Sequence, residues 1–230
     1  GVPPDGNTLF EIGSITKVFT TTLLAEMHLR GELKLDDPVS DYLPPSIPRL
    51  AKGGVEVTIR HLATHTSGLP RLPKNLGWKN MLSDNPYARY TEGDLLNCVA
   101  KVCLNATPGT TMQYSNLAMG LLGHVLATVA QTDYETLVIE RICNPLGMDD
   151  TAITINDDLI HRLASGHAGG KPVPNWDLPA LAGAGALRST AHDMALFLRA
   201  NTAPESTPLE KAIELAHTLQ VSRRPSFHFA

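Results

Sequence analysis

The chain has 230 residues, 43% hydrophobic and 18% charged, which is the composition of a globular protein rather than of a disordered one. Its formal net charge of −4 provides neither a basic face for nucleic acid nor a polybasic patch for a membrane surface, so we expect no nucleic-acid partner. The apolar runs are too short to predict a transmembrane segment, and the first residues do not have the pattern of a signal peptide.

The first predicted element is a helix over residues 14–30, where an apolar stripe repeats with helical spacing and Gly31 provides a stop. A proline-rich connection follows. Residues 55–59 alternate apolar and polar side chains and predict a short strand, but Thr58 could equally cap a short helix over residues 61–65.

The middle of the chain is predicted to be mainly helical. Residues 69–90 read as a long loop, and residues 91–94 form a capping box for a helix that reaches Val102. A turn at Pro108-Gly109 precedes another apolar helix, which extends to Val129.

The last third alternates helices with irregular segments. A helix over residues 134–142 is predicted to end before Pro145, and residues 151–188 look irregular. Residues 190–193 indicate a second capping box, and a final helix is predicted over residues 209–219. The pattern is therefore helix-dominated, with few convincing strands.

Ser14 and Lys17 are the first candidate catalytic pair. They follow Gly13 and lie three residues apart at the start of the first predicted helix, so their side chains share one face. A serine hydroxyl needs a nearby base to act as a nucleophile, and a lysine whose charge is disfavoured can be that base. The alternative is a helix-capping serine beside a solvated lysine, since Ser-x-x-Lys is expected about once by chance in a chain this long.

Tyr114 and Asn116 form the second candidate feature, directly before the apolar helix. A phenol beside an ammonium group can lose its proton and act as a base. An asparagine offers both a donor and an acceptor to an amide-bearing substrate. The alternative is a packed turn tyrosine followed by Asn116 as the helix N-cap.

Other reactive side chains point to no cofactor. Cys98 and Cys103 do not have a metal or redox spacing, and we interpret them, with Cys143, as small buried hydrophobes. His61 and His65 are four residues apart, which suits a metal, but no third ligand is evident, so we predict no metal site.

Taken together, the motifs resemble those of the serine β-lactamase-like superfamily, which includes class C β-lactamases, DD-peptidases and β-lactamase-fold esterases. The resemblance covers most of the chain and depends on the order and spacing of its motifs. These are Leu9-Phe10-Glu11-Ile12-Gly13-Ser14-Ile15-Thr16-Lys17, Gly31-Glu32-Leu33-Lys34-Leu35-Asp36-Asp37-Pro38, His61-Leu62-Ala63-Thr64-His65-Thr66-Ser67-Gly68-Leu69-Pro70, Tyr114-Ser115-Asn116, Asn144-Pro145-Leu146-Gly147-Met148 and Ser189-Thr190-Ala191-His192-Asp193-Met194-Ala195.

The resemblance implies roles for the matching positions. Ser14 would be the acylated nucleophile, and its backbone N–H would form half of the oxyanion hole. Lys17 and Tyr114 would share the proton transfer, and relatives leave open which one is the base. Asn116 would bind the amide side chain of the substrate and help to hold Lys17.

The resemblance also implies an α/β fold of the β-lactamase/penicillin-binding-protein transpeptidase type. We expect residues 1–230 to be a single β-lactamase-like domain, truncated at both ends, whose central sheet is incomplete. The family's third motif, Lys-Thr-Gly or His-x-Gly on a strand, does not appear after Asp193, and His167-Ala168-Gly169 precedes the expected position. Apolar surface exposed by the absent strands could be covered by self-association into a homo-oligomer.

The expected function is that of an acyl-serine hydrolase whose small-molecule substrate is a β-lactam or a small carboxylic ester. Two alternatives remain: a D-amino-acid peptidase, and a catalytically impaired relative that binds a ligand or acts as a scaffold. We expect acylation of Ser14 rather than efficient turnover, because the third motif is missing. The resemblance favours a periplasmic or secreted location, but the sequence leaves a cytoplasmic one open.

Overall fold

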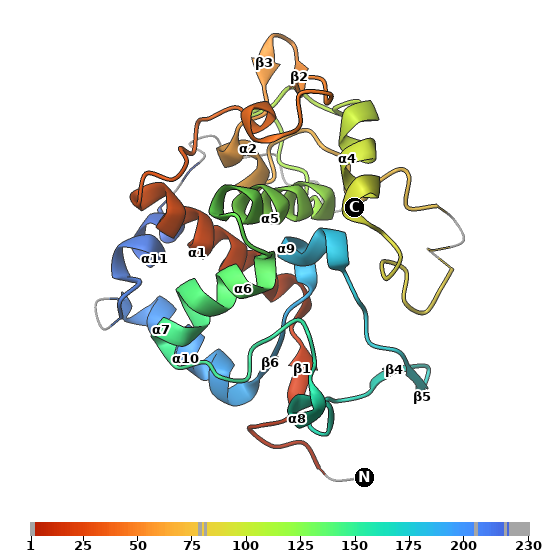
Figure 1. Cartoon of the computed structure of the whole chain (residues 1–230), viewed down its shortest axis with the longest axis vertical. Coiled ribbons are helices and arrows are strands. Elements are labelled where there is room, and N and C mark those ends of the chain that lie inside the picture. Colours follow the sequence, from red (N-terminus) through yellow and green to blue (C-terminus); the bar gives the residue numbers. More distant parts are fainter. Residues whose placement is uncertain (1–2, 78–79, 81, 205–206, 219, 221–230) are drawn as a thin grey trace.

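A computed structural model describes residues 3–77, 80, 82–204, 207–218 and 220. Helices dominate these residues (Figure 1). The helical elements are η1 (Gly13–Ile15), α1 (Thr16–Leu29), η2 (Val39–Tyr42), α2 (Ile59–Ala63), α4 (Glu92–Lys101), α5 (Asn116–Ala130), α6 (Tyr134–Val138), η3 (Ile139–Cys143), α7 (Asn144–Leu146), α8 (Asp157–Ile160), η4 (Pro179–Leu181), α9 (Ala182–Gly185), α10 (Ala191–Thr202) and α11 (Glu210–His217). The strands are β1 (Leu9–Glu11), β2 (Ala51–Lys52), β3 (Val55–Glu56), β4 (Gly166–Ala168), β5 (Lys171–Val173) and β6 (Arg188–Thr190).

Helices α1 and α5 form the centre of the molecule, and α9 packs against both of them (Figure 1). Helix α11 covers another part of α1. Helix α1 is buried over most of its length because its side chains are apolar or small on nearly every side. This burial fixes the start of α1, which directly follows the η1 turn that carries the predicted nucleophile.

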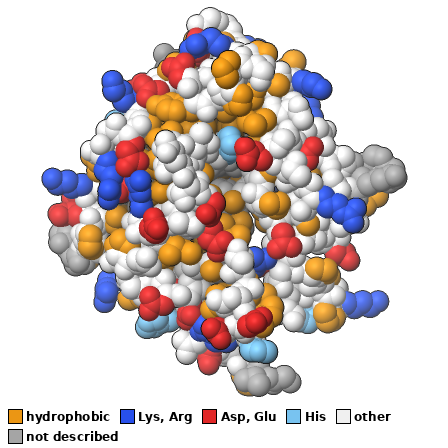
Figure 2. All heavy atoms as spheres, viewed as in Figure 1, with side chains coloured by type: hydrophobic (Ala, Val, Ile, Leu, Met, Phe, Trp, Pro, Cys, Tyr) orange, Lys and Arg blue, Asp and Glu red, His pale blue; other side chains and the backbone are white. Residues whose placement is uncertain are grey.

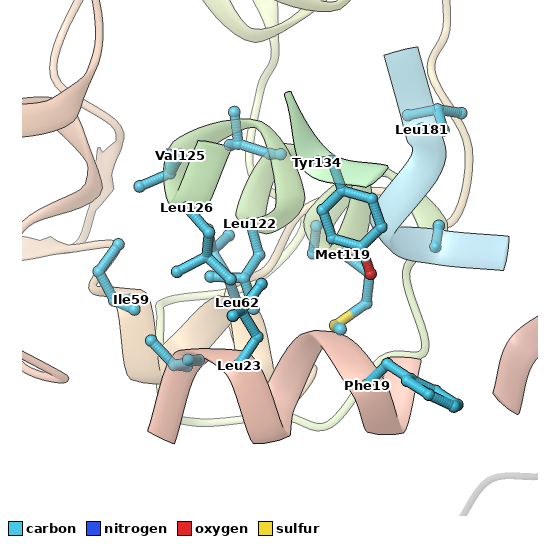
Figure 3. Packing of buried hydrophobic residues seen from close by; sticks show 14 of the residues in the cluster. Phe19, Leu23, Ile59, Leu62, Met119, Leu122, Val125, Leu126, Tyr134 and Leu181 are labelled. Carbon is cyan, nitrogen blue, oxygen red and sulfur yellow. The ribbon is translucent and has the colours of Figure 1, made fainter. Parts of the chain in front are cut away.

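The hydrophobic core lies where α1, α2 and α5 meet (Figure 3). Leu23 of α1 points toward Leu122 and Leu126 of α5, and Leu62 of α2 packs beside them, whereas Phe19 of α1 points away from this group in the same core. All five side chains are buried. Each contributes about 1.5–3 kcal/mol of hydrophobic stabilisation, so the core holds the two central helices in a fixed relation.

The strands of the described residues form three two-stranded sheets. Strand β1 pairs antiparallel with β6, so that Phe10 lies opposite Ser189. Strands β2 and β3 form one hairpin, and β4 and β5 form another. The β1–β6 pair joins the residues before Ser14 to the segment that follows α9, and thereby brings two distant parts of the chain to one place (Figure 1).

Several predicted helix boundaries are confirmed. Thr91 and Asp94 form a reciprocal capping box at the start of α4. Both alternatives for residues 55–65 are present in part: Val55–Glu56 form the short strand β3, and Thr58 caps α2, which begins at Ile59 and ends at Ala63. Thr190 caps α10, but the carboxylate of Asp193 does not complete a box, because it accepts hydrogen bonds from Thr151 and the Asp150 backbone instead.

Other boundaries differ from the prediction. The helix that begins at Tyr134 does not stop before Pro145, because a π-helical turn at η3 leads into α7, whose first turn accommodates the proline. Residues 151–188, predicted as irregular, contain α8, the β4–β5 hairpin, η4 and α9. The last helix ends at His217, and residue 219 of the predicted range lies outside the described residues.

Acidic and basic side chains are interspersed on the face shown in Figure 2, with apolar patches between them. Within the described ranges, no helix has both the length and the apolar character needed to cross a membrane.

Candidate active site

Ser14 lies in the turn that leads into α1. Gly13 has a φ of +49°, a left-handed conformation that favours glycine, and η1 then runs directly into the helix. Ser14 is exposed, whereas Lys17, one turn further along, is only 7% exposed. The predicted pairing of the two side chains on one helix face is therefore present.

The Ser14 hydroxyl lies between two candidate proton carriers. Its Oγ is 2.6 Å from the Oη of Tyr114 and 3.0 Å from the Nζ of Lys17. Lys17 also donates to the backbone carbonyl of Ala184 in α9, at 2.5 Å. The structure thus brings together the nucleophile and both bases expected from the sequence, across 100 residues of chain.

The surroundings of Lys17 disfavour its charge. Burial lowers the pKa of its ammonium group, an effect opposed by the hydrogen bond and charge of Tyr114 and reinforced by the nearby charge of Arg71. The Nζ also lies 4.8 Å from the centre of the Tyr114 ring. Lys17 is therefore a lysine whose proton is more easily lost than usual.

Tyr114 is fixed by its neighbours in the chain. Ser115 caps α5 by accepting from the Ala118 N–H, while its own hydroxyl donates to the Pro70 carbonyl. The Ser115 N–H donates to Nδ1 of His65. Asn116 is thus the first residue of α5, not its N-cap.

The pKa of Tyr114 is lowered overall. Burial acts to raise it, but the hydrogen bonds with Lys17 and Ser14, and the charges of Lys17 and Arg71, outweigh that effect. The Arg71 guanidinium lies 5.2 Å from the centre of the Tyr114 ring. The positive surroundings therefore favour the phenolate.

His65, for which the sequence predicts no metal site, is a neighbour of Tyr114. Its ring lies 4.7 Å from the Tyr114 ring, and burial together with the charge of Lys17 lowers its pKa to about 4. His65 is consequently neutral at physiological pH and accepts a hydrogen bond rather than adding a charge. Its contacts with Tyr114 and Ser115 could not be inferred from the spacing of four residues between His61 and His65.

A cavity of about 180 Å³ opens beside Ser14. Its lining includes Asn116, Ala184, Gly185, Tyr87 and Trp176. The Oδ1 atom of Asn116 is buried, with no hydrogen-bond partner among the described residues. Sequence reasoning did not identify Arg71, Trp176 or the Ala184 carbonyl, and no motif marked them.

The remaining sequence candidates lie elsewhere or have other contacts. His167 is exposed in the β4–β5 hairpin, and His61 completes the cap of α2. Cys98 and Cys143 are buried, as predicted, but Cys103 is exposed, so the interpretation is wrong for Cys103. Across the part of the chain that the structure describes, no group of three His, Cys, Asp or Glu side chains could hold a metal.

A family model and the curated relatives of this chain point to the same protein family. The β-lactamase family model matches residues 1–228. The D-alanyl-D-alanine-carboxypeptidase/endopeptidase AmpH of Escherichia coli K12 is 34% identical over 199 residues, covering 86% of this chain and 50% of that protein. The human putative beta-lactamase-like 1 is 35% identical over 204 residues, covering 84% of this chain and 38% of that protein.

A solved structure is similar as well. The β-lactamase/D-alanine carboxypeptidase from Yersinia pestis, complexed with citrate, matches with a TM-score of 0.78 and 29% identity, covering 87% of this chain and 56% of that one. The chain thus spans about half the length of the curated relatives it matches. The match also supports the expected α/β fold of the β-lactamase type. On the family model, the relatives and the fold, the chain belongs to the β-lactamase family.

Proposed function

We propose that the chain is an acyl-serine hydrolase in which Ser14 is the nucleophile and Lys17 and Tyr114 move the proton. The observation that carries the proposal is the position of the Ser14 Oγ, within hydrogen-bond distance of both the Lys17 Nζ and the Tyr114 Oη. Each of these two groups has a pKa lowered from its usual value, which suits proton transfer near neutral pH.

The hydrogen bonds suggest an order for the transfer. A protonated Lys17 has only donors, so Ser14 accepts from Lys17 and points its own hydrogen toward Tyr114. In this proposal Tyr114, as phenolate, takes the proton while the Ser14 Oγ bonds to the carbonyl carbon. The C–N bond of a lactam or the C–O bond of an ester then breaks, and the proton passes to the leaving group. Water hydrolyses the acyl-enzyme to regenerate Ser14.

We propose a β-lactam or a small carboxylic ester as the substrate. One relative is named as a β-lactamase, which supports the β-lactam. Another is named as a D-alanyl-D-alanine carboxypeptidase, so a D-amino-acid peptide is the alternative substrate. Asn116 lines the cavity beside Ser14 and has an unpaired amide oxygen, which supports its proposed role of binding an amide of the substrate.

Intact-protein mass spectrometry tests the proposal. The chain is incubated with a β-lactam and, separately, with a fluorophosphonate activity probe, which loses fluoride as the Ser14 Oγ–P bond forms. We expect one adduct in the parent chain and in the control Ser165→Ala, whose serine is exposed elsewhere, and none in Ser14→Ala. An adduct that survives Ser14→Ala would contradict the proposal.

Turnover then distinguishes the substrate classes. A chromogenic cephalosporin, a p-nitrophenyl ester of a short acid and a D-alanyl-D-alanine peptide are compared at equal concentrations. Hydrolysis of one of them identifies the class. A Ser14 adduct that forms without hydrolysis of any of them would favour the alternative of a covalent binding protein.

A further inference from the structure

We propose that Tyr87 and Trp176 form an aromatic subsite that selects acyl groups carrying an aromatic ring, and that Glu11 and Arg188 hold this subsite in place. The inference rests on the proposed acyl-serine function, because it concerns the group attached to the carbonyl that Ser14 would attack. It adds the chemical class of the acyl group, which neither the motifs nor the names of the relatives specify.

The two aromatic rings meet at the wall of the Ser14 cavity. Their centres are 5.5 Å apart and their planes are inclined at 62°, an edge-to-face arrangement. Tyr87 is buried, whereas Trp176, which also lines the cavity, is 46% exposed. An exposed indole against a cavity is a surface on which a flat ring can stack.

The size of the cavity suits one ring. A protein cavity of about 150 Å³ can hold a benzene molecule, and this one measures about 180 Å³. Leu178 adds an apolar side chain to the lining, and Ala184 and Gly185, which also line the cavity, take up little of its space because they are small. Among the cavity-lining side chains, Asn116 provides the amide that can pair with a polar group between ring and carbonyl.

Trp176 is held through its backbone. Its N–H donates to the Glu11 carboxylate at 2.5 Å, and its carbonyl accepts from Arg188 at 2.9 Å. The Arg188 side chain is only 6% exposed, and it also donates to Asp177 at 3.1 Å. Because these bonds fix the peptide groups on both sides of Trp176, they also fix the backbone position from which the indole projects.

A second pair of hydrogen bonds joins the two aromatic segments. The Asn85 amide donates to the Asp177 carboxylate at 2.9 Å, and the Asp177 N–H donates back to Asn85 at 3.0 Å. Asn85 precedes Tyr87 by two residues, and Asp177 follows Trp176. These two hydrogen bonds therefore hold the loop over residues 82–90 and the segment before η4 together next to the rings, which supports a preformed subsite.

Equilibrium binding in the Ser14→Ala background tests the subsite independently of the chemistry. The probes are N-phenylacetylglycine and N-acetylglycine, compared by calorimetry. We expect the aryl probe to bind at least about tenfold more tightly, because it buries a ring, and Trp176→Ala to remove most of that difference. Trp176→Phe should retain it, and Leu198→Ala, which removes a 63% exposed side chain on α10, should not affect it.

Acylation rates in the parent chain give a second measurement. The burst rates with p-nitrophenyl phenylacetate and p-nitrophenyl acetate are compared in the parent, Trp176→Ala, Glu11→Ala and Glu11→Gln chains. We expect both alanine variants to lose the aryl preference while Ser14 still reacts with the fluorophosphonate probe. Glu11→Gln should restore the preference, since its amide oxygen can still accept from the Trp176 N–H.

The outcomes separate the two proposals. Equal binding of the two glycine probes, or an aryl preference unchanged by Trp176→Ala, overturns the aromatic subsite even if Ser14 is acylated. Aryl-selective binding with no Ser14 adduct supports the subsite and overturns the acyl-serine function. If Glu11→Ala leaves the preference intact, Glu11 is not a positioning residue.

Discussion

Three side chains approach the ring of Tyr114: the Lys17 and Arg71 cations and the neutral imidazole of His65. The Tyr114 hydroxyl is hydrogen-bonded to Ser14, so Tyr114→Phe would keep the ring and remove the proposed proton acceptor. We expect the rate of Ser14 acylation to fall by about 10²-fold or more. Stopped-flow measurement of the acylation burst checks this. Tyr42→Phe, which alters a hydroxyl bonded to Asp37, is the matched control and should leave the rate unchanged.

The pH dependence of acylation follows from the charges around Tyr114. If the phenolate accepts the proton, the rate rises as pH increases through the pKa of Tyr114, which lies below its usual 10.0. Arg71 helps to lower that pKa, so Arg71→Gln should raise it and move the midpoint of the profile to higher pH. His65, with a pKa of about 4, adds no step near neutrality.

The pH profiles of the parent and Arg71→Gln chains provide the measurement. Arg199→Gln, which removes an exposed charge on α10, should leave the midpoint unchanged. A shift of the Arg71→Gln profile to lower pH would mean that the titrating group is not stabilised as an anion by Arg71.

At this scale, sequence and structure agree unevenly. Ser14, Lys17 and Tyr114 were predicted because each belongs to a short motif whose chemistry depends on residue type and spacing. The Ala184 carbonyl could not be predicted, because any residue supplies a carbonyl and the contact spans 167 residues. Trp176 and Arg71 could not be predicted either, because both lie in loops, whose positions do not follow from a periodic sequence pattern.

At the scale of elements, the close approach of α9 to α5 determines where Lys17 finds its second partner. A Cβ added at Gly183 would lie 2.8 Å from the Met119 carbonyl and 2.9 Å from the Gly123 Cα, both backbone atoms that cannot rotate away. Gly183→Ala should therefore push α9 from α5 and reduce the free energy of unfolding by about 1–3 kcal/mol.

Urea unfolding measures this effect. Gly185→Ala is the control in the same helix, because its added Cβ would meet its nearest atoms at 3.7 Å, an ordinary contact. Its midpoint should stay close to that of the parent. Equal midpoints for the two variants would show that α9 adjusts without cost and that its contact with α5 is not tight.

Elements with local start signals were the ones predicted well. Thr91 and Asp94 fix the beginning of α4 through their own side chains, so a short sequence window suffices. The sequence does not predict the β4–β5 hairpin. Its turn contains Gly169 and Gly170, both with positive φ, but each strand has only three residues and β5 contains Pro172, so no strand pattern is visible. The helical segment that begins at Tyr134 continues past Pro145 through a π-helical turn, and no local sequence pattern predicts that turn.

At the scale of the whole molecule, a partly buried ion network ties α1 to the η3 turn. The Arg141 guanidinium donates to Glu26 of α1 at 3.1 Å and to Glu32, which follows that helix, at 2.8 Å. Glu26 is 7% exposed and also pairs with Arg30. Segments more than 100 residues apart therefore share one cation. Helix α1, which carries Lys17 and follows Ser14, is thus held to the rest of the fold at its far end.

Removing that cation should cost more than removing an exposed one. Arg141→Ala leaves a buried carboxylate with one cation fewer, and we expect the free energy of unfolding to fall by about 1–3 kcal/mol, less than for a fully buried pair because the Arg141 side chain is 20% exposed. Arg49, whose partners Asp41 and Glu56 lie at the surface, is the matched control, and Arg49→Ala should hardly move the urea midpoint. Because buried charges are weakly screened, the loss in Arg141→Ala should persist in about 0.5 M NaCl. A loss that disappears in salt would mean that the network acts as a surface ion pair and does not anchor α1.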